Sequence, residues 1–186
     1  GEGVSTYDLM DTISADQLKV NLVAIFAVYF VMVILQKDFL MPAALVISIE
    51  SAIWINFSIP YYMGSYMFYI AYLIVSSIQL GATVDYAILM SDRYKEFRIG
   101  KATKQEAIID TIEAVSVSIL TSGLVLTIVG LLLDFFCSNL LLAQIGHFVG
   151  IGAFFSLLIV FFVLPGILFI LDKLLFRKHL KIKRII

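Results

Sequence analysis

The sequence is poor in charge and in cysteine, and both shortages limit the class of protein. Charged residues make up 15% of the 186 positions, against about a quarter in a typical soluble domain, while hydrophobic residues make up 61%. A soluble domain of this size cannot bury so much apolar surface in its core. The single cysteine, Cys137, excludes an intrachain disulfide. The composition therefore predicts a membrane protein.

The sequence also lacks the motifs of several functional classes. No phosphate-binding loop, nucleic-acid motif or nucleophile with a matching base is present, so we expect neither an enzyme nor a cofactor. His147 has no second His, Cys or carboxylate at ligand spacing, which favours a packed or interfacial histidine over a metal site. Residues 1–17 do not resemble a cleavable signal. Because the chain opens with Gly1 rather than Met, we interpret it as a fragment of a longer protein.

Five stretches are long and apolar enough to cross a bilayer. About 20 residues are needed, because a helix rises about 1.5 Å per residue through about 30 Å of hydrocarbon. The last stretch is so long that it must tilt, protrude or bend at Pro165. We predict an all-α integral membrane protein whose five-helix transmembrane bundle covers residues 18–176, between an extracytoplasmic lead-in at 1–17 and a basic cytosolic tail at 177–186. The predicted spans are 18–35, 39–57, 65–90, 115–133 and 140–171.

The basic residues predict the orientation of the chain. With the N-terminus outside and the C-terminus in the cytosol, every Lys and Arg except Lys19 falls on the cytosolic side, as the positive-inside rule requires. Between the third and fourth spans, Thr103 and Glu106 have the spacing of a capping box. Isoleucines then recur at helical spacing. This pattern predicts a cytosolic amphipathic helix over residues 103–114 that leads into the fourth span.

Asp85 is the acid for which a position within the hydrocarbon is expected to be the most unfavourable. It lies eight residues before Arg93, roughly 12 Å from the cytosolic mouth. A carboxylate at that depth costs about 2.5–3.5 kcal/mol on insertion scales, so it must be neutral much of the time or reach water and a partner. A proton relay needs such a group. Gly81 leaves a notch on the same face, and Asp92 lies on that face at the cytosolic end. The alternative is a structural Asp85, permanently protonated or bonded to hydroxyls of the fourth span.

Other polar and small residues in the spans allow either functional or packing roles. Glu50, near the middle of the second span, either lines a polar cavity or relay site or makes one hydrogen bond to a neighbouring helix. The hydroxyls of Thr121 and Ser122 are the best candidates to face Asp85, although packing is the favoured interpretation of that stripe. Small residues let membrane helices approach closely. We expect this packing role for Gly81, Gly123, Gly146 and Gly150.

The motif around Asp85 resembles one family. The run Gly81-Ala82-Thr83-Val84-Asp85-Tyr86, followed by Asp92-Arg93-Tyr94, resembles the Gly-xxx-Asp-Tyr helix of the MmpL-type branch of the resistance-nodulation-division exporters. Thr121-Ser122-Gly123 and the run from Gly146 to Leu164-Pro165 are similar to the last two helices of one half of such an exporter. The resemblance implies that Asp85 is the proton-relay acid and Tyr86 its partner. It also implies a five-helix unit like a sterol-sensing domain, and the basic tail favours the C-terminal half.

Two functional hypotheses follow. In the first, the chain is the transmembrane segment of an exporter of lipids or other hydrophobic compounds, driven by the proton motive force, in the multi-pass plasma (inner) membrane of a bacterium. Its partners are the lipid bilayer, the other half of the transporter or a homodimer partner, and a hydrophobic or lipid substrate, with no nucleic acid. Residues expected to support the relay are Thr121, Ser122, Glu50 and Asp92. In the second, the chain is a lipid-sensing or scaffolding module without transport.

Overall fold

The computed structural model describes residues 2–64, 66–100 and 103–175, and nearly all of them are helical. The elements are α1 (Glu2–Gln36), α2 (Leu40–Met63), α3 (Tyr69–Gly100), α4 (Lys104–Phe136), α5 (Leu140–Leu158), the π-helical segment η1 (Ile159–Val163) and α6 (Leu164–Leu175). The last three follow one another without a break, so they form one rod. Within the described residues, five helices are long and apolar enough to cross a membrane, and the last of them is this rod. The prediction of an all-α chain with five such helices is confirmed.

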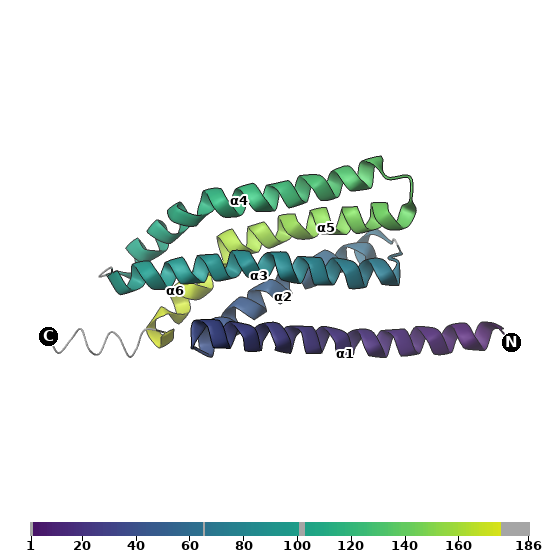
Figure 1. The fold of residues 1–186 in the computed structure, drawn as a ribbon, viewed down its shortest axis with the longest axis horizontal. Coiled ribbons are helices and arrows are strands. Elements are labelled where there is room, and N and C mark those ends of the chain that lie inside the picture. The colour runs from purple at the N-terminus through teal and green to yellow at the C-terminus, as the bar shows by residue number, and fades with distance from the viewer. Residues whose placement is uncertain (1, 65, 101–102, 176–186) are drawn as a thin grey trace.

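Successive rods run in alternating directions, so their connections gather at two ends of the molecule (Figure 1). Helix α5 lies among α2, α3 and α4 and packs most extensively against α4, while α1 lies at the edge against α2. One end holds the α1–α2 and α3–α4 connections and the end of α6. We call it the basic end, because these described residues gather there: Lys37, Arg93, Lys95, Arg98, Lys104 and Lys173. The other end, with Asn139, is the opposite end.

Local capping explains where several helices begin and end. Thr103 is the N-cap of α4, and its Oγ1 accepts a hydrogen bond from the Glu106 amide at 3.3 Å, as the spacing predicts. Helix α4 then continues to Phe136, so the amphipathic segment and the fourth span form one helix. Asn139 caps α5 in the same way, because its Oδ1 accepts from the Leu141 and Leu142 amides. Gly64 ends α2 with a left-handed φ of 62°.

Glycines let α4 and α5 approach until their backbones are in contact. A Cβ built on Gly130 would lie 2.5 Å from the Gly150 backbone nitrogen, and one on Gly146 would lie 2.7 Å from the Gly130 carbonyl oxygen. Only hydrogen fits at such distances, so backbone contacts backbone directly. Gly123 likewise has the side chain of Leu157 against it. Gly81 differs: a Cβ there would meet no atom within 4 Å, so no described helix of this chain packs against it.

The last rod bends at η1, which ends two residues before Pro165. The Leu164 amide donates to the Ile159 carbonyl, five residues back, instead of to the carbonyl four residues back. Pro165 has no amide hydrogen to donate, so the helix lacks one backbone hydrogen bond at this position. A π-helical turn absorbs one extra residue, and the chain changes direction at it. Figure 1 shows α6 turning away from the axis of α5.

Candidate functional site

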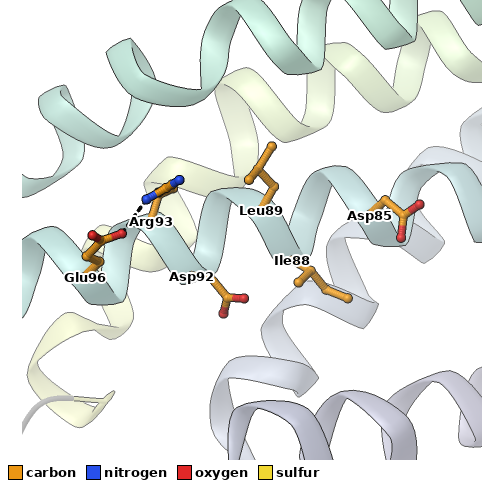
Figure 2. A pocket seen from close by; sticks show the side chains of 6 residues that line it. All are labelled: Asp85, Ile88, Leu89, Asp92, Arg93 and Glu96. Atoms are coloured by element: carbon orange, nitrogen blue, oxygen red, sulfur yellow. Dashed lines mark hydrogen bonds and ion pairs between the residues drawn. The ribbon is translucent and has the colours of Figure 1, made fainter.

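The exposed face of α3 carries the candidate site. Asp85 lies at one end of a groove of about 380 Å³, and among the described residues it makes no hydrogen bond or ion pair. The residues along the groove are three or four positions apart on one helix, so they share one side of it. Figure 2 shows Ile88 between the acids and Asp92 projecting near the basic end. The lining residues are Asp85, Ile88, Leu89, Asp92, Arg93 and Glu96.

The charged side chains in the groove differ in whether they form an ion pair. Arg93 Nη1 lies 2.6 Å from Glu96 Oε2, one turn further along, and both side chains are exposed. Exposed pairs of this kind contribute about 0–1 kcal/mol, so this contact adds little to stability. Asp92 is exposed and lies about 10 Å along the axis from Asp85, seven residues away. The groove therefore leads from Asp85, within the apolar part of the helix, to a second acid close to the basic end.

Tyr86 points away from this groove. It is 9% exposed and packs in the main hydrophobic core, with Met90 and Ile49 among its members. Consecutive residues on a helix project about 100° apart, so neighbours in the sequence face different surroundings. Tyr86 and Asp85 form no hydrogen bond with each other in the described part of the chain. The partnership implied by the family motif is therefore absent as a direct contact, and Tyr86 instead anchors the buried side of α3.

The other expected support residues do not gather around Asp85. The Thr121 hydroxyl donates to the Val117 carbonyl at 2.7 Å, and the Ser122 hydroxyl donates to the Ser118 carbonyl at 2.9 Å. Both hydroxyls are therefore hydrogen-bonded to carbonyl groups of α4 itself, and both side chains are exposed. Half-buried Glu50 interacts with the Trp54 indole one turn along α2. Of the support residues, only Asp92 shares the groove with Asp85.

A buried polar network lies behind the groove, where α2, α3 and α5 meet. Asn56 Nδ2 donates to Gln79 Oε1 at 2.8 Å, and Gln79 Nε2 donates to the Gly152 carbonyl at 3.3 Å. The Thr83 hydroxyl donates to the Gln79 carbonyl at 2.6 Å, and Thr83 Oγ1 and Ser156 Oγ are hydrogen-bonded at 2.8 Å. Gly152 makes the space for both amides, because a Cβ there would lie 2.5 Å from each of them. These contacts fix the rotation of α3, so Thr83 faces inward and Asp85 faces out.

Sequence reasoning did not assign this network. The available signal was the presence of two amide side chains, Asn56 and Gln79, within long apolar stretches, where each needs a partner. Asn56 Oδ1 is buried and has no hydrogen-bond partner among the described residues.

A second buried cluster lies at the basic end and joins α3 to α6. Arg98 Nε lies 2.6 Å from Asp172 Oδ1, and Arg98 Nη2 lies 3.0 Å from Asp172 Oδ2. The Tyr94 hydroxyl donates to Asp172 Oδ1 at 2.7 Å. The Arg98 and Asp172 side chains are 7% and 5% exposed. In the sequence, Arg98 indicates only the orientation of the chain. The clue to its partner is Asp172, an acid near the end of a long apolar stretch.

His147 has a partner that its sequence spacing did not reveal. Its Nδ1 lies 2.7 Å from Asp134 Oδ2, and both side chains are about one-third exposed at the opposite end. The close glycine packing of α4 on α5 brings them together from different helices. Among the described residues, no group of three or more His, Cys, Asp or Glu side chains is placed to hold a metal ion.

One comparison with known proteins gives a match. The model of the MMPL family matches residues 1–184, almost the whole chain. No curated protein and no solved structure matches the chain.

Proposed function

Since the chain belongs to the MMPL family of membrane transporters, we propose that it is the transmembrane segment of an exporter of lipids or other hydrophobic compounds, driven by the proton motive force. As a segment of such a transporter, it lies in a lipid bilayer and is not an enzyme. Asp85 carries the proton in this proposal. The observation that supports it most is an exposed acid without a partner among the described residues, within an apolar helix, in a groove that reaches Asp92.

The chemistry follows from the surroundings of the carboxyl group. When the groove is closed by lipid or by another helix, an ionised Asp85 costs about 2.5–3.5 kcal/mol, so the neutral acid is favoured. When water enters past Asp92, the carboxylate is solvated and the proton can leave. Since each 1.4 kcal/mol is a factor of ten, protonation shifts the balance between closed and open arrangements on the order of 100-fold. Such a shift is enough to drive a conformational cycle.

We orient the basic end toward the cytosol and the N-terminus outside. The positive-inside rule supports this, because basic residues of the described chain concentrate at one end. Asp85 then lies in the cytosolic half of the bilayer, and protons leave along the groove. The open notch at Gly81 lies one turn from Asp85. We propose that this face receives the other half of the transporter, or a second copy, in the inner membrane of a bacterium.

In this proposal Asp92 keeps its expected supporting role, whereas Tyr86, expected as the direct partner of Asp85, has an indirect one. Asp92 is the second acid on the exit route, because it alone of the support residues lines the groove. Tyr86 acts on Asp85 indirectly, because its buried ring helps to hold the rotation of α3. Thr121, Ser122 and Glu50 remain candidates for contacts with a partner, since none of them touches Asp85.

The test replaces Asp85 by Asn in the complete transporter, which keeps the shape and removes the titration. Substrate export and proton uptake are measured in proteoliposomes with an imposed proton gradient. We expect Asp85→Asn to abolish gradient-driven export while the protein still elutes as a folded species. Asp134→Asn is the matched control, because it also removes an acid from a spanning helix but lies outside the groove, at the opposite end, and it should retain export. Normal gradient-driven export by Asp85→Asn would refute the relay and favour a module that moves no proton.

A further inference from the structure

Helix α2 marks the two boundaries of the hydrocarbon. The rings of Tyr61 and Tyr62 are exposed near its end, and tyrosines of this kind gather where a membrane meets water. Leu40, where α2 begins, lies 21 residues before Tyr61, about 32 Å along the axis. The hydrocarbon of a bilayer is about 30 Å thick. The boundary at the basic end therefore passes close to the α1–α2 connection.

The same measure places the start of α6 at this boundary. Gln144, one turn inside α5, donates to the Tyr66 carbonyl at 2.7 Å and accepts from the Phe68 amide at 2.7 Å. Gln144 therefore lies level with the α2–α3 connection, next to the exposed tyrosines. From Gln144, about 30 Å of helix reaches Leu164, the first residue of α6. Helix α5 crosses the hydrocarbon, and η1 lies at its far side.

The bend at η1 keeps α6 close to the membrane. Headgroup layers add only about 6 Å to each side of the hydrocarbon. A straight rod would carry Leu174 about 15 Å past Leu164, through that layer and into water. Figure 1 shows α3 and α4 reaching beyond the α1–α2 connection at the basic end, whereas α6 turns away from the axis of α5. Helix α6 therefore runs obliquely, against α2 and α4, at the level of the boundary.

Helix α6 has one face in the bundle and one face outside it. Its buried residues follow at every fourth position: Leu164, Leu168 and Asp172. On the outer face, Ile170 is 76% exposed and Leu174 is 59% exposed, with exposed Lys173 beside them. An apolar stripe flanked by a basic residue is the pattern of a helix that lies in the interface of a membrane.

The charge of this segment complements anionic phospholipids. Within the described residues, Lys173 forms no hydrogen bond or ion pair, so its ammonium group is available to a phosphate. No acidic residue follows Asp172 in the sequence, whereas five basic residues do: Arg177, Lys178, Lys181, Lys183 and Arg184. Each basic residue near an anionic membrane surface strengthens binding about five-fold.

We propose that α6 is an interfacial helix of the inner leaflet, with Ile170 and Leu174 at the boundary of acyl chains and headgroups and Lys173 on the phosphates of anionic phospholipids. The choice of leaflet rests on the proposed orientation of the chain. The Arg98–Asp172 pair joins α6 to α3, and Lys104 joins α4 to it over the Phe169 ring. An interfacial α6 therefore fixes the level of the whole bundle, Asp85 included, relative to the inner surface.

Spin labels in the complete transporter measure the depth of α6. Its native cysteines, Cys137 included, are replaced, and one label at a time is attached at an exposed position. The labelled variants are Ile170→Cys, Leu174→Cys, Phe154→Cys in α5 and Ile109→Cys in α4. In nanodiscs that contain phosphatidylglycerol, the accessibility of each label to oxygen and to a water-soluble nickel chelate gives its depth.

The two α6 labels should lie between the reference positions. Phe154 follows Gln144 by ten residues, so its label should lie near the centre of the hydrocarbon. Ile109 lies in the part of α4 that extends past the boundary, so its label should lie in water. Labels at Ile170 and Leu174 should lie within about 5–10 Å of the phosphates. Nickel accessibility at Leu174 equal to that at Ile109 would overturn the proposal and indicate a face in water, and so would a depth equal to that of Phe154.

The contact with anionic headgroups has its own control. In nanodiscs of phosphatidylcholine alone, the nickel accessibility of the Leu174 label should rise. Because losing one basic contact weakens binding about five-fold, Lys173→Gln should raise it in phosphatidylglycerol as well. Lys37→Gln removes another exposed lysine of the basic end, but from the α1–α2 connection, and should leave it unchanged. Identical accessibility in the two lipids, or equal effects of the two variants, would refute this contact.

The failures of the two proposals are distinguishable. If an impermeant maleimide added outside intact cells labels Ile109→Cys, the orientation is wrong, and with it the assignment of α6 to the inner leaflet. If the reagent labels Ile109→Cys only from the cytosolic side while Leu174 is as accessible to nickel as Ile109, the orientation stands and the interfacial helix is refuted. Normal export by Asp85→Asn refutes the relay and leaves the depth of α6 unaffected.

Discussion

Alanine at Gly146 puts a methyl group between two backbones. The new Cβ would lie 2.7 Å from the Gly130 carbonyl oxygen and 2.8 Å from the Asp134 amide nitrogen. Neither atom belongs to a side chain that can rotate away, so α4 and α5 must separate by several tenths of an ångström along their contact. Overpacking of this kind costs about 1–3 kcal/mol. In a bilayer no hydrophobic force compensates, because packing itself holds the helices together.

The chain contains its own graded controls for this substitution. At Gly150 the nearest atoms to a new Cβ are at 3.0 Å, so Gly150→Ala should destabilise less than Gly146→Ala. At Gly81 a Cβ meets nothing within 4 Å, and alanine there should be neutral or stabilising by up to about 1 kcal/mol, since glycine is a poor residue in a helix interior. Backbone clash therefore ranks the three variants in the order Gly146, Gly150, Gly81.

Thermal unfolding in bicelles measures the ranking. With roughly 2–4 °C per kcal/mol for a chain of this length, Gly146→Ala should lower the melting temperature by about 2–12 °C, and Gly81→Ala should leave it unchanged or raise it slightly. Equal losses at Gly146 and Gly81, or no loss at Gly146, would contradict the direct backbone contact between α4 and α5. Gly81→Leu adds a functional readout: if another subunit covers the Asp85 face, this variant should impair export while the melting temperature of the bundle is retained.

Two further predictions concern the contacts that the spans conceal. Thr83→Val keeps the side-chain shape and removes the hydrogen bond to Ser156. It should therefore destabilise the bundle by about 0.6–1.7 kcal/mol in the same unfolding assay. A neutral result would show that the network does not fix the rotation of α3. Asp134→Asn at the partly exposed pair with His147 should cost no more than about 1 kcal/mol and leave gradient-driven export unchanged; loss of export would assign this pair a part in proton transfer.

The number and character of the helices could be predicted from the sequence because hydrocarbon thickness fixes the length of an apolar span. Helix ends were harder to predict. The third stretch was expected to end near residue 90, yet α3 continues to Gly100. Charged residues such as Arg93 and Glu96 end the apolar stretch without ending the helix, because both are good helix formers and pair one turn apart. An apolar span and a helix therefore end at different residues.

The contacts between helices could not be predicted from the sequence. Arg98 and Asp172 are 74 residues apart, and Asn56 and Gln79 are 23 apart, with no periodicity connecting either pair. A sequence pattern gives the faces of one helix, whereas the rotation of that helix against its neighbours decides which faces meet. The family motif likewise implied a partnership between Asp85 and Tyr86, which are adjacent along the chain. The step of roughly 100° per residue separates their side chains in space.

The rotation of α3 is what leaves Asp85 open to the groove. Lipid tails discriminate little between apolar faces, so an apolar rod in a bilayer turns at low cost until polar contacts stop it. On α3 these contacts follow one inward stripe at helical spacing: Gln79, Thr83, Tyr94 and Arg98, with Tyr86 and Met90 between them. Asp85 lies off this stripe and therefore faces outward for as long as the stripe holds. The relay acid is thus exposed by the polar contacts on the opposite side of its own helix, and a change that loosens them changes the surroundings of Asp85 without touching it.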